Sequence, residues 1–151
     1  MPKITPFLWF NNNAEEAINF YISIFPNSKI VSLMGPKGAI IGATFVLDGQ
    51  EFRALNGGPH YKLTPAFSLF VDLDTQKEVD ELWDKLIAGG GKPSRCGWLE
   101  DRFGLSWQVI PRTLGKLLGD KDPQKSKRVM DAMLKMVKID IKKLKDAYAG
   151  K

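Results

Sequence analysis

The sequence predicts an α+β protein made of two tandem βαβββ modules followed by C-terminal helices. A strand-like segment, a capped helix and three further strand-like segments occur twice in the same order. The two helices carry apolar residues at matching positions, with Leu82 following Phe20 by 62 residues. A fixed period of this size indicates a duplicated supersecondary unit. We therefore expect one domain over residues 1–151, with modules at 1–63 and 64–112 and helices at 113–151.

The first module begins with an apolar strand over residues 4–10 and a helix that is capped by Asn13. Glu16 lies three residues after Asn13, as in a capping box. Pro26 ends the helix because proline cannot continue a helical hydrogen-bond pattern. Three strands are expected next, at residues 29–34, 40–47 and 50–56.

The second module repeats this order from a strand over residues 67–73. Thr75 caps the helix, with Glu78 three residues later, and Gly89 follows the last helical turn. Shorter strands are expected at residues 92–96, 97–100 and 105–110. Helices then cover residues 113–118 and 123–148, with Asp140 as the start of a final short helix.

Composition is that of an ordinary globular protein, with 44% apolar and 26% charged residues in a chain of 151. No apolar run approaches the roughly 20 residues that span a bilayer, and the first residues lack the layout of a signal peptide. Cys96 is the one cysteine, so an internal disulfide is excluded. These features favour the cytoplasm and argue against a membrane partner.

The net charge of +5 is concentrated near the C-terminus. From Arg112 to Lys151 there are 12 Lys and Arg and 5 Asp, which leaves 10 basic and 12 acidic residues before Arg112. A basic segment can bind phosphate backbones. The lysines here follow an amphipathic helical pattern without a groove-reading motif, so a solvated helix face is favoured over a nucleic-acid contact.

Four segments resemble the PhnB-like family, which is also described as demethylubiquinone 3-methyltransferase-like and belongs to the vicinal oxygen chelate (glyoxalase) superfamily. They are PFLWFNNNAEEAINFYISIFPNSKI at 6–30, FRALNGGPHYKL at 52–63, CGWLEDRFGLSWQVIPR at 96–112 and KRVMDAMLKMVKIDIKKL at 127–144. The resemblance implies curved sheets around a pocket and a homodimer. In many members of the superfamily the pocket holds a divalent metal bound by two His and two Glu.

The ligand positions that the resemblance implies fall near Thr5, Phe67 and Gln108, and within residues 54–56 of the first module. None of them carries an imidazole or a carboxylate, the groups that a catalytic metal site requires. The single histidine, His60, lies in a loop.

Two carboxylates near these strands remain as substitutes, Glu51 and Glu100. Strand alternation predicts that both face outward. The sequence therefore predicts no metal site and no cofactor, which argues against glyoxalase-like or ring-cleaving chemistry.

A methyltransferase that uses S-adenosylmethionine places a Gly-rich loop between a strand and a helix. The glycine clusters of this chain, at residues 57–58 and 89–91, do not open a helix after a strand. Hairpins also occur where a doubly wound parallel sheet would need crossovers.

The resulting prediction is a metal-free protein that binds a small molecule in a mostly apolar pocket. Strand alternation and the chelate alignment assign Ala54 to the pocket beside the candidate ligand-binding residues. These candidates are Phe7, Trp9, Asn56, Cys96, Trp98, Ser106 and Gln108. The alternatives are ordinary core and rim residues at these positions, a metal-dependent lyase, dioxygenase or transferase, the demethylubiquinone 3-methyltransferase activity, and a binder that only sequesters its ligand. For Cys96, an inert buried thiol is favoured over a nucleophile.

Overall fold

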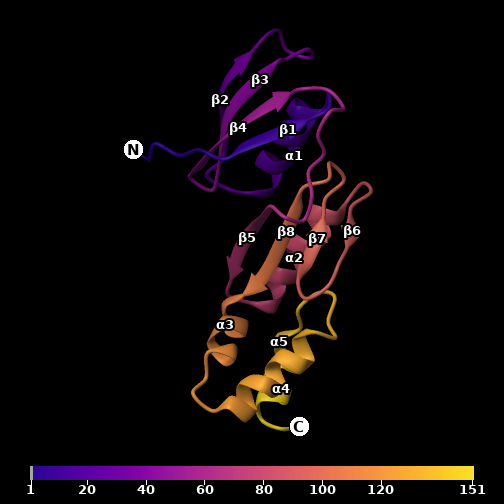
Figure 1. The fold of residues 1–151 in the computed structure, drawn as a ribbon. Coiled ribbons are helices and arrows are strands. Elements are labelled where there is room, and N and C mark those ends of the chain that lie inside the picture. Colours follow the sequence, from indigo (N-terminus) through magenta and orange to yellow (C-terminus); the bar gives the residue numbers. More distant parts are fainter. Residues whose placement is uncertain (1) are drawn as a thin grey trace. The chain divides into compact units, whose positions relative to one another are not determined.

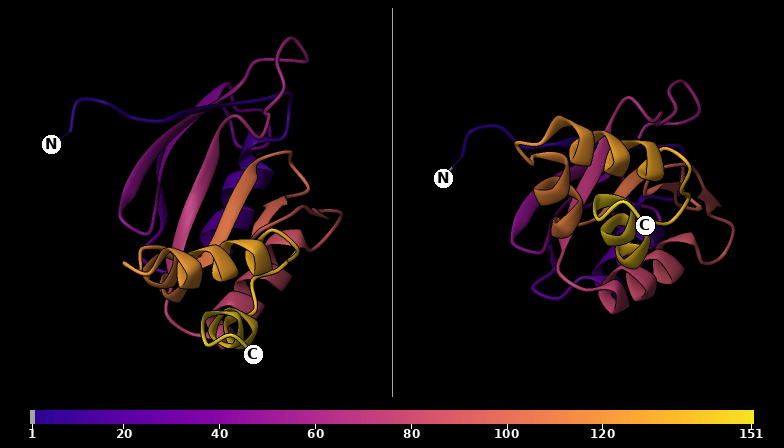
Figure 2. Two further views of the ribbon diagram at one scale, coloured as in Figure 1. Left: turned by 60° about the horizontal axis from the view of Figure 1, so that its bottom comes forward. Right: turned by 90° about the horizontal axis from the view of Figure 1, so that it is seen from below.

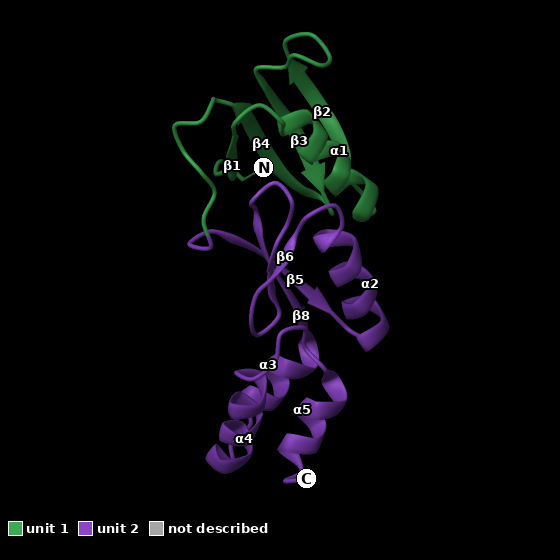
Figure 3. Ribbon diagram, turned by 90° about the vertical axis from the view of Figure 1, so that its right-hand side faces the viewer, with its two compact units in different colours: residues 1–64 green, residues 65–151 purple. Residues whose placement is uncertain are grey.

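A computed structural model describes residues 2–151 and shows the strands and helices in the expected order (Figure 1). The chain divides into two compact units, residues 1–64 and 65–151 (Figure 3). Each unit contains one four-stranded mixed sheet. The predicted fold, two βαβββ modules with C-terminal helices, is confirmed.

The first unit forms a sheet in the strand order β1-β4-β3-β2. Strands β1 and β4 are parallel and the other neighbours are antiparallel. The elements are β1 (Phe7–Phe10), α1 (Ala14–Ile24), β2 (Lys29–Met34), β3 (Gly42–Leu47) and β4 (Gln50–Asn56).

Helix α1 packs against β3 and β4, and this side of the sheet holds the core of the first unit. Phe45 and Phe52 are cross-strand partners whose stacked rings lie 5.5 Å apart between centroids. Strand residues alternate between the two faces, and most residues of β1, β3 and β4 on the helix side are buried. These buried strand residues are Leu8, Phe10, Ala43, Phe45, Leu47, Phe52 and Ala54.

The second unit repeats this sheet in the order β5-β8-β7-β6, with β5 and β8 parallel. Leu99, Trp107 and Val109 are buried on the face that carries the second helix. The elements are β5 (Ser68–Leu73), α2 (Gln76–Ile87), β6 (Lys92–Pro93), β7 (Trp98–Glu100) and β8 (Ser106–Pro111).

The connections between the first strand and the helix differ in length between the units. Three residues, 11–13, separate β1 from α1, whereas two, 74–75, separate β5 from α2. Equivalent positions of the two helices are therefore 62 residues apart, as the sequence predicts. Equivalent positions of the two first strands are 63 residues apart, because the first connection is one residue longer. Phe70 rather than Leu69 is the counterpart of Phe7.

The C-terminal helices α3 (Arg112–Leu118), α4 (Pro123–Met133) and α5 (Ile141–Tyr148) pack on one another within the second unit (Figure 2). Their buried cluster includes Ile110 from the end of β8. The helical region expected over residues 123–148 is interrupted from 134 to 140. A final short helix begins after Asp140, as the sequence predicts, and Asp140 caps it by accepting a hydrogen bond from the Lys143 amide.

Gln76, at the start of α2, holds the segment that precedes α5. Its side-chain amide donates to the carbonyl of Ile139 at 3.0 Å and accepts from the amide of Ile141 at 2.8 Å. The ion pair between Lys138 and Asp80, at 2.8 Å, adds a second link. Hydrogen bonds from Lys138 and then Gln76 lower the pKa of the Asp80 carboxyl.

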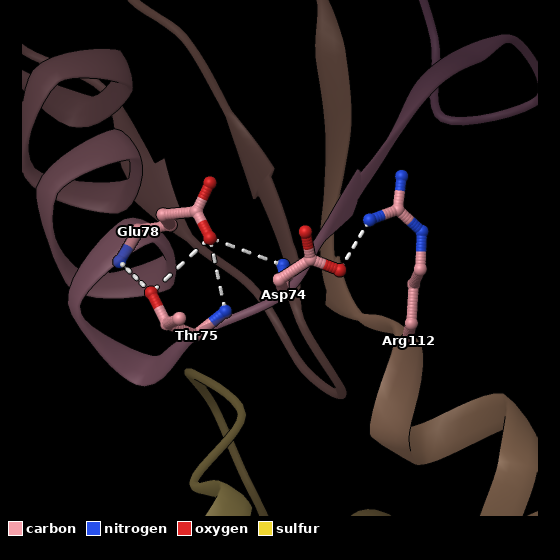
Figure 4. Close-up of polar contacts among 4 residues, drawn as sticks. All are labelled: Asp74, Thr75, Glu78 and Arg112. Atoms are coloured by element: carbon pink, nitrogen blue, oxygen red, sulfur yellow. Dashed lines mark hydrogen bonds and ion pairs between the residues drawn. The ribbon is translucent and has the colours of Figure 1, made fainter.

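The two predicted helix caps differ in the structure. Thr75 and Glu78 form the complete capping box that the sequence predicts for α2 (Figure 4). At α1 the prediction is wrong, because the Asn13 side chain makes no capping hydrogen bond. Asn56 provides the acceptor instead, as its Oδ1 receives the amide of Ala14 at 2.9 Å.

None of the helices within residues 2–151 combines the length and the apolar character that crossing a bilayer requires.

Candidate functional site

We call the side of each sheet that faces away from α1 or α2 its open face. In the first unit, residues that are paired across neighbouring strands place their side chains in rows on this face. One row runs Phe7, Arg53, Thr44 and Ser32, and the next runs Trp9, Leu55, Gly42 and Met34. Phe7 is 59% exposed, so its ring is available for contact.

A cavity of about 430 Å³ lies on the open face of the first unit. This volume falls within the range of small-molecule sites. Gly42 has no side chain, so the surface of the sheet is not covered between its cross-strand neighbours Leu55 and Met34. The remaining residues that line the cavity are Phe7, Ser32, Leu33, Ile41, Ala43, Thr44, Arg53 and Ala54.

The predicted residue Trp9 shares a cross-strand row with three lining residues of this cavity but does not itself line it. Its indole N–H donates to the carbonyl of Gly58 at 2.9 Å, and its ring meets Tyr61 edge to face at 4.9 Å. A Cβ on Gly57 would overlap the Trp9 ring. Trp9 thus anchors the loop at residues 57–61.

Asn56 does not share the open face with Phe7 and Trp9, so this expectation is wrong. In the parallel register Phe7 lies opposite Arg53 and Phe10 opposite Asn56, which puts Asn56 on the helix side. Its Nδ2 donates to the carbonyl of Ile40 at 3.1 Å while its Oδ1 holds the first amide of α1. Ala54 likewise belongs to the buried core, although it also borders the cavity on the open face.

In the second unit, the predicted residues Trp98, Ser106 and Gln108 do share the open face. Trp98 is the cross-strand partner of Gln108, and Gln108 lies opposite Phe70 in the parallel pair. Gln108 Nε2 donates to Ser68 Oγ at 2.9 Å. The arrangement is neutral and amide-rich, with Phe70 55% exposed beside it.

Cys96 belongs to the turn before β7 rather than to the open face. It has a positive φ of 58°, and its amide donates to the carbonyl of Met136 at 2.8 Å. The next amide, of Gly97, donates to Val137 at 2.8 Å. This turn therefore ties the sheet to the segment between α4 and α5, and Cys96 is half-buried.

The two carboxylates that were expected to face outward instead lie on the open faces. Glu51 is paired with Val46 and shares the side of Arg53, and Glu100 is paired with Ser106. The Thr5 hydroxyl donates to Glu51 at 3.5 Å. Within residues 2–151, no three His, Cys, Asp or Glu side chains converge in a group that could hold a metal ion.

A second hollow, of about 550 Å³, lies between the start of α2 and the start of α5. Its charged lining residues are three aspartates, Asp74, Asp140 and Asp146, and two lysines, Lys142 and Lys145. Lys142 lies 2.9 Å from Asp146, and Asp74 forms an ion pair with Arg112, which does not itself line the hollow (Figure 4). Because carboxylates outnumber cations here, this hollow offers less to an anionic ligand than the cavity of the first unit.

The strand register corrects the correspondence between the modules. Arg53 lies opposite Phe7 as Gln108 lies opposite Phe70, so Arg53 is the counterpart of Gln108. Ser68, rather than Phe67, is the counterpart of Thr5. The helix offset of 62 led to Phe67, one residue away from Ser68. Sequence reasoning missed Arg53 for a separate reason: it assigned Ala54 and Asn56 to the pocket, and in a strand their neighbour Arg53 points to the opposite face.

The two tandem βαβββ units define a protein of the glyoxalase, or vicinal oxygen chelate, fold. A sequence profile of the family described as 3-demethylubiquinone-9 3-methyltransferase matches residues 2–110. The chain therefore belongs to this PhnB-like family. The matched region ends before the C-terminal helices, so the likeness of residues 127–144 lies outside it.

Solved structures agree with this assignment. A protein from Bacillus cereus, described as a putative 3-demethylubiquinone-9 3-methyltransferase, PhnB protein, is 39% identical with a TM-score of 0.66, over 73% of this chain and 99% of that one. Protein PA1353 from Pseudomonas aeruginosa is 23% identical with a TM-score of 0.61, over 74% of this chain and 98% of that one.

The fold also resembles that of the fosfomycin resistance protein FosX from Listeria monocytogenes, solved with Mn(II) and sulfate. FosX is 16% identical with a TM-score of 0.53, over 71% of this chain and 89% of its own. A search among curated proteins finds no match.

Proposed function

We propose that this protein binds a small organic molecule in the cavity on the open face of its first sheet, without a metal ion. The cavity itself is the observation that carries the proposal. It combines a suitable volume, mainly apolar walls and a few polar groups, which is the usual composition of a small-molecule site.

The position of the cavity within the fold supports this proposal. Side chains on the helix side of the sheet are mostly buried by packing against α1. By contrast, Phe7, Met34 and Ile41 are 59%, 64% and 57% exposed. Apolar side chains that gather at an exposed hollow are typical of a binding site. The metal-free part rests on the neutral or cationic side chains at the corresponding strand positions, Gln108 and Arg53.

The experiment is calorimetric titration of a panel of small amphipathic compounds into the wild-type protein and two variants. Ser32→Trp places an indole in the cavity from the exposed face of β2. Lys29→Trp makes a similar change on the same strand outside the cavity and serves as the control. We expect at least one compound to bind wild type and Lys29→Trp alike and Ser32→Trp at least about tenfold more weakly.

Equal binding to all three proteins, or no binding across the panel, would contradict the proposed site. Dialysis against EDTA tests the metal-free part, because the affinity is expected to stay the same. A loss of binding that Mn²⁺ restores would overturn it and favour the metal-dependent alternative.

Methyl transfer, to which the family's name refers, is not the function that the geometry favours. The two connections that lead from a strand into a helix, residues 11–13 and 74–75, contain no glycine, whereas a nucleotide-type cofactor is held by a Gly-rich turn at that position. Incubation with S-adenosylmethionine and a demethylubiquinone is expected to give no methylated product. Product formed by the purified protein would reverse this conclusion.

A homodimer is proposed as the working assembly, as the superfamily resemblance implies. Exposed apolar residues on both sheets outside the cavity, such as Val31 and Phe70, are the kind of surface that a second copy covers. Light scattering on the eluting protein is expected to give twice the chain mass of 16.9 kDa. A mass equal to one chain would contradict the dimer.

A further inference from the structure

The cavity of the first unit has one charged lining residue, Arg53. In the cross-strand row, Arg53 lies between Phe7 on β1 and Thr44 on β3, and Ser32 follows on β2. One guanidinium and two hydroxyls therefore occupy adjacent strands on the same face. All three groups can donate hydrogen bonds.

Arg53 has no carboxylate partner among residues 2–151, since no ion pair or side-chain hydrogen bond involves it there. The carboxylate closest along its strand on the same face, Glu51, is one cross-strand row away and does not line the cavity. Glu51 also receives the hydroxyl of Thr5. The charge that faces the cavity is therefore positive.

The other large side chains at the cavity are apolar. Met34, Leu55 and the exposed ring of Phe7 share the open face with Arg53, and Leu33 and Ile41 also border the cavity. A ligand that neutralises Arg53 and covers these side chains needs an anionic group at one end and a hydrocarbon body at the other. A guanidinium matches carboxylate and phosphate oxygens with paired, charge-assisted hydrogen bonds.

The second unit lacks this combination. At the position equivalent to Arg53 it carries Gln108, whose side-chain N–H is already donated to Ser68. The hollow beside α2 does contain two cations, Lys142 and Lys145, but three aspartates line it with them, Asp74, Asp140 and Asp146. A net positive charge among the lining residues is thus a feature of the first-unit cavity and not of this hollow.

We propose that the ligand of this cavity is an organic anion with an apolar body, whose carboxylate or phosphate group binds Arg53, Thr44 and Ser32. This inference rests on the proposed function, because it names the class of molecule that the same site takes. It does not depend on a metal or on a reaction.

Three probes with the same hydrocarbon chain separate charge from shape: octanoate, the neutral octanamide and the cationic octylammonium. Calorimetry is expected to show octanoate binding to wild type about tenfold more tightly than octanamide, with octylammonium weakest. Added salt weakens octanoate binding and leaves octanamide unchanged, since screening acts on the charge.

The variants assign this preference to residues. Arg53→Gln is expected to weaken octanoate about tenfold and to leave octanamide within about twofold, whereas Arg53→Lys retains most of the preference because the charge remains. Thr44→Val keeps the shape and removes a hydroxyl, and is expected to cost about threefold for octanoate. The melting temperature of each variant shows whether it is folded.

The outcomes distinguish the two proposals. If octanoate and octanamide bind wild type equally and Ser32→Trp abolishes both, the cavity binds small molecules but the anion preference is wrong. If an octanoate preference persists in Arg53→Gln, the anion group lies elsewhere and this inference fails. If Ser32→Trp affects no probe, the proposed site itself is wrong.

Discussion

The Trp107 indole N–H donates a hydrogen bond to the Asp101 carboxylate at 2.9 Å, and both side chains are almost completely buried. The same carboxylate accepts the amides of Phe103 at 2.9 Å and Leu105 at 3.1 Å. Asp101 therefore closes the turn between β7 and β8 from within. The segment that most resembles the family, residues 96–112, contains this arrangement.

Replacing Asp101 by Asn is expected to lower the free energy of unfolding by about 2 kcal/mol, because an amide cannot accept all three hydrogen bonds and its NH₂ opposes a donor. Trp107→Phe is expected to cost a similar amount, since it leaves a buried acceptor without its indole partner. Urea denaturation measures both. Asp84→Asn, the same chemical change at an exposed position of α2, is the control and is expected to be neutral. A cost for Asp84→Asn equal to that for Asp101→Asn would contradict this account.

Asn56→Ala is expected to destabilise the first unit by about 2 kcal/mol, because it removes the partners of the Ala14 amide and the Ile40 carbonyl. Asn13→Ala is expected to cost less than about 0.5 kcal/mol, since the Asn13 side chain makes no capping hydrogen bond. Thermal and urea unfolding compare the two. The reverse ranking would show that Asn13, as the sequence suggested, is the functional cap.

Gly57→Ala is expected to lower stability by about 1–3 kcal/mol, because the new Cβ would overlap the Trp9 ring. The same change should weaken the contact between Trp9 and Tyr61 and shift the tryptophan emission spectrum. Gly115→Ala is the matched control. Its Cβ would meet nothing within 4 Å in α3, so a gain of about 0.5–1 kcal/mol from helix propensity is expected. Unchanged stability in Gly57→Ala would mean that the loop at 57–61 does not depend on Trp9.

Tyr148 donates to Asp120 at 2.6 Å, and the pair gives a pH-dependent link between α5 and the loop before α4. The hydrogen bond from Tyr148, followed by that from the Asp122 amide, lowers the pKa of Asp120. The Asp120 carboxylate raises the pKa of Tyr148. The stabilising form is ionised Asp120 with protonated Tyr148.

The stability that Asp120 contributes is present above about pH 4 and is lost as the pH falls through its lowered pKa. The contribution of Tyr148 is present below about pH 10 and is lost as the pH rises through its raised pKa. Tyr148→Phe is therefore expected to differ from wild type most at neutral pH and to converge with it at both extremes. Tyr61→Phe is the control, since the Tyr61 hydroxyl makes no hydrogen bond within the described residues 2–151. A difference for Tyr148→Phe that does not vary with pH would contradict the pairing.

Element order and helix starts could be predicted from the sequence because they depend on local signals. Thr75 with Glu78, and Asp122 before Pro123, are capping patterns within four residues, and both form as expected. The break between α4 and α5 was harder to predict, because residues 134–140 retain a helical apolar pattern. There the chain is fixed instead by Gln76 and by the turn at Cys96, both distant in sequence.

Site residues were predicted less well because strand faces depend on register. The alternation within β8 correctly grouped Ser106 with Gln108. For β4 the opposite phase was assigned, which placed Ala54 and Asn56 on the open face and left Arg53 unnoticed. No signal in a single sequence distinguishes the two phases of a short strand whose residues are mixed on both faces. The cationic character of the cavity therefore emerged only from the structure.

The additional residue between β1 and α1 has an evolutionary consequence. After a duplication, one residue can be inserted into or deleted from that connection without changing how the helix packs or which strand residues face the core. The difference in residue number between equivalent positions is then no longer the same for the helices and for the strands. Each half can then acquire its own ligand-binding residues, arginine in one half and glutamine in the other. Equivalent residues of the two halves must therefore be identified from the strand pairing and not from one constant difference in residue number.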